Sequence, residues 1–264
     1  MQTALFDCHT HTEFSACAED VSLQRYVEIT RTSDQPFAIT DHSAQIFYPP
    51  TNRWGFWSDD AVALFEANIE SGGARIRHYV DTIREAQCGG MYVGTELDVL
   101  PDGRMVFPDD LLGSLDTVAG AVHSMPTLKA ERPLDEIYAE FRFQVTALAG
   151  HGIDLLVHPY RLVLAAGAPV SDALVDWTVR CARDGGFALE INSHKQCEDA
   201  DLRMVRLALE MGVTLAIGTD THRTSEFGDF SYHRQILRDA GLPEESWSAH
   251  LLQPPVAAEA AAAE

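Results

Sequence analysis

The 264-residue sequence has little positive charge. It contains 19 lysines and arginines against 40 aspartates and glutamates, a formal net charge of −21 at pH 7, and its two lysines are Lys129 and Lys195. A field of this sign repels phosphate backbones, so we expect no binding of duplex nucleic acid. A small anionic substrate at a locally positive site remains compatible with this composition, and bound divalent metals would offset part of the charge.

The sequence also lacks long apolar runs. No uncharged apolar run of about 18 residues is present, so we expect no membrane-spanning helix. The first residues show neither the basic segment nor the apolar stretch of a signal peptide. The five cysteines are odd in number and irregularly spaced, which predicts reduced thiols rather than a disulfide framework. These absences together predict a cytoplasmic protein.

Short apolar, β-branched segments alternate along the chain with helical patterns. The predicted strands are about 4–8, 36–40, 91–97, 117–122, 154–157, 187–191 and 214–218. The predicted helices are about 22–31, 59–67 with a continuation over 74–86, 133–150, 171–186, 199–212 and 232–240. This alternation predicts an α/β protein with a parallel sheet, either a barrel or a doubly wound sheet. No glycine-rich nucleotide fingerprint supports the doubly wound alternative.

The chain shows no domain linker. We therefore expect one barrel domain over 1–253, followed by a flexible, Ala-rich tail over 254–264. The loop predicted over 43–59 is rich in aromatic residues between Phe47 and Trp57. Two alternatives are open for this loop, a lid over a site or a loop that packs its own aromatic residues onto the barrel.

Seven of the 11 histidines fall at or just after the predicted carboxyl ends of strands. In a parallel α/β barrel these ends open on one face, where active sites lie. Two pairs have a spacing of two residues, which places both side chains of a pair on the same side of a strand. Imidazoles together with carboxylates favour Zn²⁺, Mn²⁺ or Fe²⁺ over Mg²⁺ or Ca²⁺. The residues that predict this metal cluster are His9, His11, His42, Glu96, His123, His158, His194, Asp220 and His222.

The motifs around these residues resemble, in order over about 3–225, those of the PHP (polymerase and histidinol phosphatase) superfamily. They are Asp7-Cys8-His9-Thr10-His11-Thr12, Thr40-Asp41-His42, Gly94-Thr95-Glu96, Gly120-Ala121-Val122-His123-Ser124, Val157-His158-Pro159, Glu190-Ile191-Asn192 and Gly218-Thr219-Asp220-Thr221-His222. The resemblance implies a single distorted (β/α)7 TIM-like barrel. It also implies two or three divalent transition metal ions (Zn, Mn or Fe) and hydrolysis of phosphate esters.

The resemblance further implies how the ligands divide between metals. One metal would be held by His9, His11, Glu96 and Asp220. A second would be held by Glu96, as a bridge, with His123 and His158. A third would be held by His42, His222 and the residue six positions after His11.

At that sixth position the chain departs from the family pattern, which has a histidine or an acid there. The residue is Cys17, whose thiolate is a competent ligand for Zn²⁺. We predict that Cys17 is a ligand. A weak or empty third site, a packed thiol, and Glu19 reaching in instead remain alternatives.

The predicted reaction is hydrolysis of a small-molecule phosphomonoester or phosphodiester through metal-bound hydroxide, as in a histidinol phosphatase. Arg161, Lys195 and Arg223 follow strand-end motifs and are predicted to hold the phosphate, with plain surface charge as the alternative. His194 is predicted to protonate the leaving group, or else to neighbour the ligands. An amidohydrolase-type C–N hydrolase and a non-catalytic metal-binding module are the alternative functions. The substrate, the metal and the oligomeric state are left open.

Overall fold

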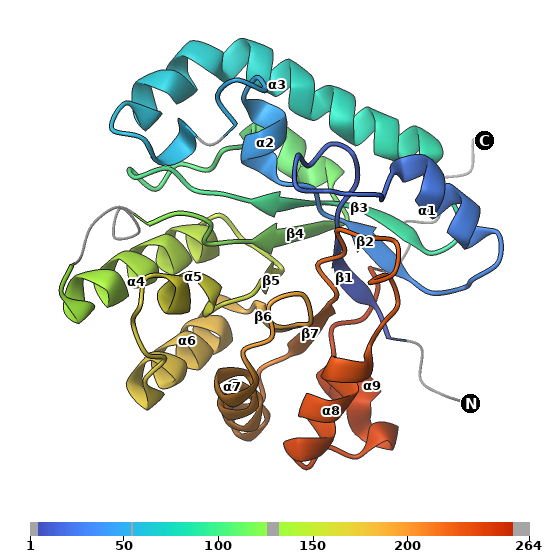
Figure 1. The fold of residues 1–264 in the computed structure, drawn as a ribbon, viewed down its shortest axis with the longest axis vertical. Helices are drawn as coiled ribbons and strands as arrows, with labels where there is room; N and C mark the ends of the chain where they lie inside the picture. Colours follow the sequence, from blue (N-terminus) through green and yellow to red (C-terminus); the bar gives the residue numbers. More distant parts are fainter. Residues whose placement is uncertain (1–4, 54, 126–131, 256–264) are drawn as a thin grey trace.

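Seven parallel strands form a closed barrel in the computed structural model, which describes residues 5–53, 55–125 and 132–255 (Figure 1). Each strand pairs with the next along the chain, and β1 closes the barrel against β7, with Asp7 opposite Ile217. This confirms the predicted fold class. The strands are β1 (Asp7–Thr10), β2 (Phe37–Ile39), β3 (Met91–Leu97), β4 (Thr117–Gly120), β5 (Leu155–Leu156), β6 (Ala188–Asn192) and β7 (Leu215–Gly218).

Helices surround the barrel, as Figure 1 shows. The α-helices are α1 (Leu23–Thr30), α2 (Ser43–Phe47), α3 (Ala61–Ala86), α4 (Leu134–Gly150), α5 (Arg161–Ala165), α6 (Asp172–Gly185), α7 (Glu198–Met211), α8 (Ser231–Asp239) and α9 (Trp247–His250). Short 3-10 helices are η1 (Gly55–Trp57), η2 (Asp109–Ser114) and η4 (Glu244–Ser246). No helix in the described ranges is long and apolar enough to cross a membrane.

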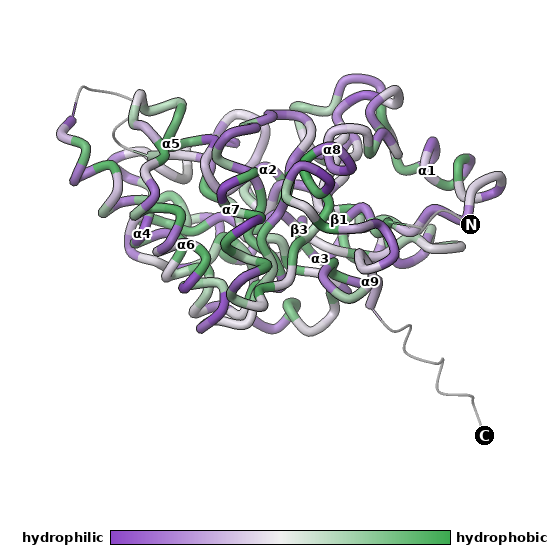
Figure 2. Tube along the Cα trace, turned by 90° about the horizontal axis from the view of Figure 1, so that it is seen from below, coloured by the Kyte–Doolittle hydropathy of each residue, from purple (hydrophilic) through white to green (hydrophobic). Residues whose placement is uncertain are grey.

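The core has two buried layers because side chains alternate between the two faces of each strand. One face packs against the helices through large apolar residues such as Phe37 and Leu189. The other face fills the narrow barrel interior with small residues, among them Ala38, Ala119 and Ala216. Figure 2 shows the apolar stretches running through the middle of the molecule, with hydrophilic stretches in the outer loops.

Helix α3 is continuous where the sequence predicted an interruption over 68–73. Gly72 lies in this stretch, and a Cβ atom built on it would be 2.5 Å from Cε2 of Phe47. The glycine therefore lets α3 lie directly against α2. Packing against α2 outweighs the low helix propensity of glycine, which explains why the helix is not broken.

The aromatic segment over 43–59 is not the plain loop that the sequence predicted. It contains helix α2 and the 3-10 helix η1, because apolar residues of α2 find partners on α3. Phe47 stacks on Phe65 of α3 at 5.0 Å between ring centroids, and both Phe47 and Tyr48 are 1% exposed. The burial of these two side chains agrees with the alternative in which the segment packs its aromatic residues onto the barrel. The lid over a site stays a prediction. Trp54 lies outside the described residues.

The predicted tail falls largely outside the described residues. Pro254 and Pro255 are described and belong to no helix or strand. Residues 256–264 are outside the described ranges, as is Lys129. The boundary of the barrel domain and the flexibility of the tail therefore stay predictions.

Candidate metal centre

Side chains from β1, β3 and β7 meet where these strands end. His9 Nε2 lies 3.2 Å from His11 Nε2, and His11 Nε2 lies 3.1 Å from Oδ1 of Asp220. Oε2 of Glu96 is 3.5 Å from Nε2 of His9 and 3.7 Å from Nε2 of His11. All four residues are buried. Strand ends that are far apart in sequence thus converge, as parallel strands in a barrel require.

Glu96 occupies the centre of the cluster. Its Oε1 lies 2.8 Å from Nε2 of both His123 and His158, and its Oε2 lies 2.6 Å from Nδ1 of His42. Burial alone would raise the pKa of Glu96, but the neighbouring histidines, His123 first, hold that pKa well below its ordinary value. Glu96 is therefore a carboxylate that faces imidazoles with both of its oxygens.

Two buried atoms of this cluster lack hydrogen bonds. They are Glu96 Oε2 and His123 Nε2, although each lies within 2.8 Å of a neighbour of complementary type. Buried polar atoms rarely stay unsatisfied, so a short separation without hydrogen-bond geometry indicates a missing partner. A divalent cation between nitrogen and oxygen donors would satisfy both atoms. The residues present therefore fit transition metal ions.

In His9 and His123 the Nδ1 atom, on the other side of the ring from the Nε2 that faces the cluster, lies beside a carboxylate oxygen. Glu190 Oε1 lies 2.8 Å from Nδ1 of His9, and Asp98 Oδ1 lies 2.7 Å from Nδ1 of His123. Burial lowers the pKa of His123, but Glu96 and Asp98 outweigh burial and raise it to about 9. Acceptors of this kind orient histidine ligands and fix which nitrogen faces the metal.

Sequence reasoning assigned no role to Glu190 or Asp98. Their positions could have indicated one, because Glu190 belongs to a strand-end motif on β6 and Asp98 directly follows β3. Asp41, which directly precedes His42 in the sequence, is a third carboxylate beside the cluster. It accepts hydrogen bonds from Thr12 and Ser15, and the Ser15 hydroxyl also lies 3.2 Å from Nδ1 of His11.

The backbone is strained at two of the predicted ligands. His158 has φ = 30° and Asp220 has φ = 52°, in the left-handed region that side chains other than glycine rarely adopt. The His158 N–H donates to Glu190 Oε2 at 2.5 Å, and the Asp220 N–H donates to the His9 carbonyl at 2.9 Å. These hydrogen bonds hold both residues in conformations that place their side chains in the cluster. Strain of this kind is found mostly at functional sites.

A further group lies at the edge of the cluster. Ligand atoms of His11, His42 and His222 lie within 4.8 Å of one another, and Cys17 Sγ is 3.2 Å from Nε2 of His42. Burial raises the pKa of the Cys17 thiol, but hydrogen bonds with His222 and His42 outweigh burial and lower it to about 6. Cys17 thus lies beside this group, and its role as a ligand of a third metal stays a prediction. Glu19 does not reach in, because its carboxylate accepts from Arg223 at 2.7 and 2.5 Å.

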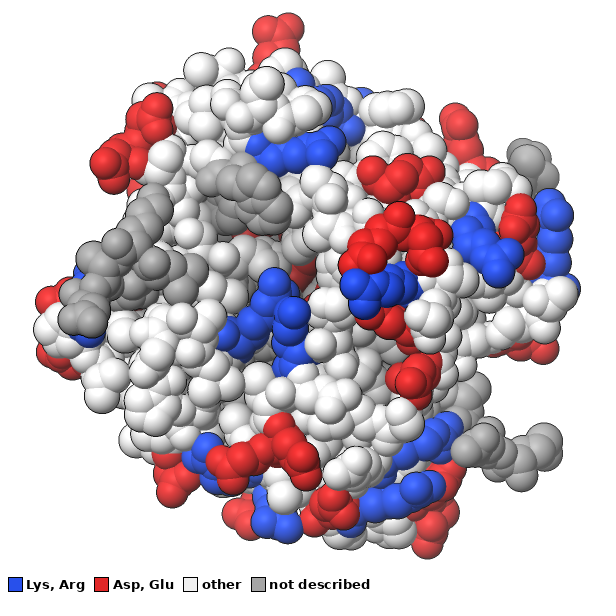
Figure 3. Space-filling model, viewed as in Figure 1, with Lys and Arg blue, Asp and Glu red and all other residues white. Residues whose placement is uncertain are grey.

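The three predicted phosphate-binding residues differ in their surroundings. Arg161 Nη1 lies 3.9 Å from Oδ2 of Asp220, at the edge of the cluster. The side chain of Lys195 has no ion-pair partner among the described residues, whereas Arg223 is engaged by Glu19. In the view of Figure 3 the surface is hollowed near its centre, and lysine and arginine side chains border the hollow.

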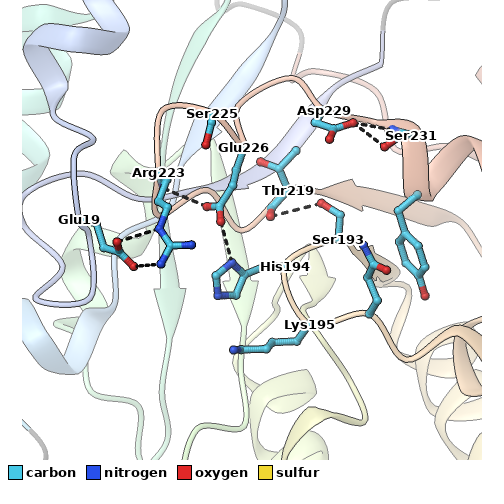
Figure 4. Close-up of a pocket in the computed structure, with 12 residues that line it drawn as sticks. Glu19, Ser193, His194, Lys195, Thr219, Arg223, Ser225, Glu226, Asp229 and Ser231 are labelled. Carbon is cyan, nitrogen blue, oxygen red and sulfur yellow. Dashed lines mark hydrogen bonds and ion pairs between the residues drawn. The ribbon is translucent and has the colours of Figure 1, made fainter.

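His194 lies beside the cluster. Its ring centroid is 4.6 Å from that of His222, and its Nδ1 is 3.4 Å from Oε1 of Glu226. With Lys195 and Arg223 it lines a pocket of about 460 Å³ (Figure 4). The structure thus brings the nine predicted metal ligands into one cluster, in which Cys17 and His123 are half-buried and the other seven are buried. It places His194, Lys195 and Arg223 along one pocket next to this cluster.

The chain is similar in sequence to several known proteins. It is 23% identical over 248 residues to a probable phosphatase of Thermoanaerobacter sp. (strain X514), covering 91% of this chain and 88% of that protein. It is 26% identical over 247 residues to a probable phosphatase of Aeromonas hydrophila, covering 90% and 87%. It is also 31% identical over 226 residues to the DNA polymerase/3'-5' exonuclease PolX of Bacillus subtilis, covering 84% of this chain but 35% of that protein.

The fold is similar to a solved structure. This is the histidinol phosphate phosphatase of Lactococcus lactis, crystallised with zinc, L-histidinol and phosphate, with a TM-score of 0.54 and 16% identity. The match covers 91% of this chain and 95% of that one. The PHP domain family model matches residues 7–194, which include β1 to β6 and seven of the nine predicted ligands. The chain therefore belongs to the PHP family.

Proposed function

We propose that this protein is a metal-dependent phosphoesterase that hydrolyses a small phosphomonoester or phosphodiester. The observation that carries the proposal is the buried Glu96 carboxylate, which imidazoles surround. Its Oε2 and the facing Nε2 of His123 both lack hydrogen bonds. Apolar packing does not explain such a cluster, whereas it suits two or three metal ions, two of which share the Glu96 carboxylate.

The ligand sets follow from proximity and from the family resemblance. His9, His11, Glu96 and Asp220 would hold one ion, and Glu96, His123 and His158 a second. His42, His222 and Cys17 would hold a third. When bound, Zn²⁺, Mn²⁺ or Fe²⁺ ions lower the pKa of coordinated water and offset the negative charge of the phosphoryl group.

The side chains of the protein perform the remaining tasks. Arg161 and Lys195 bind phosphoryl oxygens, because both are cations near the cluster and Lys195 has no other ion-pair partner among the described residues. As the oxygen of water bonds to phosphorus, the bond from phosphorus to the alcohol oxygen breaks. His194 donates a proton from Nε2 to that departing oxygen, while Glu226 at Nδ1 keeps the ring oriented.

The relatives support this proposal. Two are named probable phosphatases over most of their length, and the similar solved structure was crystallised with zinc, L-histidinol and phosphate. Hydrolysis of a small phosphorylated substrate in the cytoplasm is the simplest role consistent with these names and with the acidic charge of the chain. The PolX relative is matched over about a third of its length, so its polymerase activity is not transferred to this chain.

The test is a phosphate-release assay on purified protein of known metal content. The panel contains histidinol phosphate, nucleotides and a chromogenic ester, with and without added Mn²⁺ or Zn²⁺. We expect metal-dependent release, and a loss of about 10³-fold or more in the Glu96→Ala variant, which removes the shared ligand. Glu70→Ala, an exposed glutamate of α3, is the matched control and keeps full activity.

Two outcomes would contradict the proposal. Two or more bound metals without turnover of any ester would favour the C–N hydrolase alternative. Protein purified without chelators that contains no metal would favour neither, and would instead overturn the ligand assignment.

A further inference from the structure

The pocket beside the metal centre has an unusually polar lining. None of its 12 lining residues has an aliphatic side chain. Hydroxyl, amide, imidazole and charged groups surround its volume of about 460 Å³, and Tyr232 is the one lining residue with a benzene-type ring. Figure 4 shows these side chains arranged around a common space. They come from the ends of β6 and β7, the loop that follows β7, the start of α8 and, for Glu19, the loop between β1 and α1.

The carboxylates of this pocket are already engaged. Glu19 pairs with Arg223, and Glu226 Oε2 accepts the N–H groups of His222 and Arg223 at 2.8 and 2.9 Å. Asp229 accepts from the N–H and the hydroxyl of Ser231. Lys195, by contrast, has no ion-pair partner within the described residues. Of the two cations that line this pocket, Lys195 is therefore the one available to a ligand, whereas the neutral donors to Glu226 and Asp229 leave the negative charge of these carboxylates in place.

The pocket lies beside the proposed reaction centre. His194 lines the pocket, and its ring lies 4.6 Å from the ring of His222, a predicted ligand. Thr219, another lining residue, directly precedes Asp220. A phosphate held at the metals would thus direct its alcohol part into this space.

A second cavity is a poorer candidate for the alcohol part. It has about 240 Å³, lies between the β1–α1 loop, α2 and α3, and is bordered by Phe14 and Ile46. No predicted metal ligand or phosphate-binding residue lines it. The aromatic segment beside it is largely turned inward, with Phe47 and Tyr48 buried. Within the described residues, no exposed aromatic surface therefore lies next to the reaction centre to bind an apolar or planar alcohol part.

We propose that the substrate is the phosphate ester of a hydroxyl-rich alcohol that is neutral or anionic, such as a sugar or a polyol. This inference rests on the proposed phosphoesterase function and specifies its substrate class. The hydroxyl groups of such an alcohol replace water as partners of Gln196, Ser225 and their neighbours. An aminoalkyl alcohol is disfavoured, because it offers few hydroxyl groups to these partners and places a cation near Lys195, which has no ion-pair partner among the described residues.

The test compares kcat/KM for esters with similar leaving groups. Glucose 6-phosphate is set against cyclohexylmethyl phosphate, which has a ring of the same size without hydroxyls, and against histidinol phosphate, whose alcohol carries an amine. We expect glucose 6-phosphate to be at least about tenfold better than either, because a site built for hydroxyls rejects an analogue that lacks them.

A pair of variants connects the preference to the pocket. Gln196→Leu should lower the ratio of glucose 6-phosphate to cyclohexylmethyl phosphate by about threefold or more, because it removes an amide from the lining. Ser225→Val is a second, independent variant with the same expectation. Gln24→Leu, an exposed glutamine of α1, is the control and leaves both values unchanged.

The outcomes separate this inference from the proposed function. Hydrolysis of all three esters with equal or better rates for cyclohexylmethyl or histidinol phosphate would overturn the substrate class alone. An unchanged ratio in both pocket variants would overturn the role of the pocket. Failure to hydrolyse any ester in metal-loaded protein would overturn the proposed function, and this inference with it.

Discussion

At the scale of single residues, the site depends on positions whose importance is visible only in three dimensions. His158 and Asp220 are held at positive φ by hydrogen bonds to Glu190 and His9. Glu190 in turn needs space, which Gly218 provides on the neighbouring strand, since a Cβ atom at position 218 would overlap Glu190 Oε1. The geometry of the predicted ligands therefore rests on a glycine and a carboxylate that are not ligands themselves.

A first prediction concerns Gly218. In the Gly218→Ala variant the new methyl group displaces Glu190, so His9 loses the partner of its Nδ1. We expect metal affinity to fall by about 10- to 100-fold, as is typical when the partner of a ligand is lost. Metal competition titrations measure this change. Gly113→Ala is the control, because a Cβ atom there meets nothing within 4 Å, and wild-type affinity in Gly218→Ala would contradict the prediction.

A second prediction concerns Asp201 of α7, which lies away from the cluster. Its carboxyl group is 4% exposed and accepts from the Tyr232 hydroxyl at 2.6 Å. Burial, with a smaller effect of Glu190, raises its pKa to about 7, although the hydrogen bond from Tyr232 opposes this. The folded pKa lies above the unfolded value of 3.8. The contribution of this carboxyl group to stability is therefore largest below pH 4 and is lost as the pH rises through 7.

The Asp201→Asn variant removes this dependence. We expect it to be more stable than the wild type at pH 8 by on the order of 1 to 3 kcal/mol, with the difference vanishing near pH 4. Urea unfolding of metal-free protein between pH 4 and 8 measures the free energy of unfolding. Asp81→Asn, at an exposed position, should follow the wild-type curve. Parallel curves for Asp201→Asn and the wild type would show that the carboxyl group does not titrate in this range.

At the scale of secondary structure elements, the helices that follow the strands position the site. Helix α2 begins at Ser43, directly after the predicted ligand His42, and its last residue, Phe47, packs against α3. The contact between α2 and α3 therefore fixes the segment that carries His42. Gly72 makes the contact close, and its neighbour Gly73 offers a matched comparison within the same helix.

The third prediction uses this pair. Gly72→Ala should destabilise the protein by about 1 to 3 kcal/mol, because its methyl group would lie 2.5 Å from the Phe47 ring. Gly73→Ala should stabilise it by up to about 1 kcal/mol, because alanine favours a helix and the nearest atom is 3.6 Å away. Denaturant unfolding measures both values. Stabilisation by both substitutions would mean that α2 and α3 are not in close contact.

At the scale of the whole molecule, the net charge of −21 is combined with a cluster of buried carboxylates. Glu96, Glu190 and Asp220 are each at most 1% exposed and lie in one region. The surrounding imidazoles compensate them in part. Metal ions that bind the folded chain would add positive charge where the negative charge is most buried, so binding and folding are expected to be coupled.

The fourth prediction is that chelation destabilises the protein. With metal at about 100 times its dissociation constant, removal should cost about 2.7 kcal/mol of unfolding free energy for each site. Thermal unfolding with and without a chelator, followed by addition of Zn²⁺, measures the loss and its recovery. The Glu96→Ala variant is the control, because it lacks the shared ligand and should respond less. An equal melting temperature with and without chelator would argue against metal binding by the native fold.

The residue pattern indicated an α/β protein and the positions of the candidate ligands, and the resemblance to the PHP family selected a barrel over a doubly wound sheet. Alternation of apolar segments with helical patterns is a local signal, and so is the placement of His9, His11 and Asp220 at strand ends, because both depend on neighbours along the chain. The order of the strands in a barrel then follows from rules of connection. For these reasons β3 was predicted to the residue, and six of the helices were placed within a few residues of their bounds.

The side chains that support those candidates became identifiable once the fold was known. Glu190, Asp98 and Gly218 act through contacts between strands, and such contacts have no fixed spacing in sequence. The pairing of Arg223 with Glu19 and the burial of Phe47 depend likewise on segments that are distant along the chain. Charge and aromatic character can be read from a sequence, but whether a charge is compensated or a ring is buried depends on the partner that the fold places beside it.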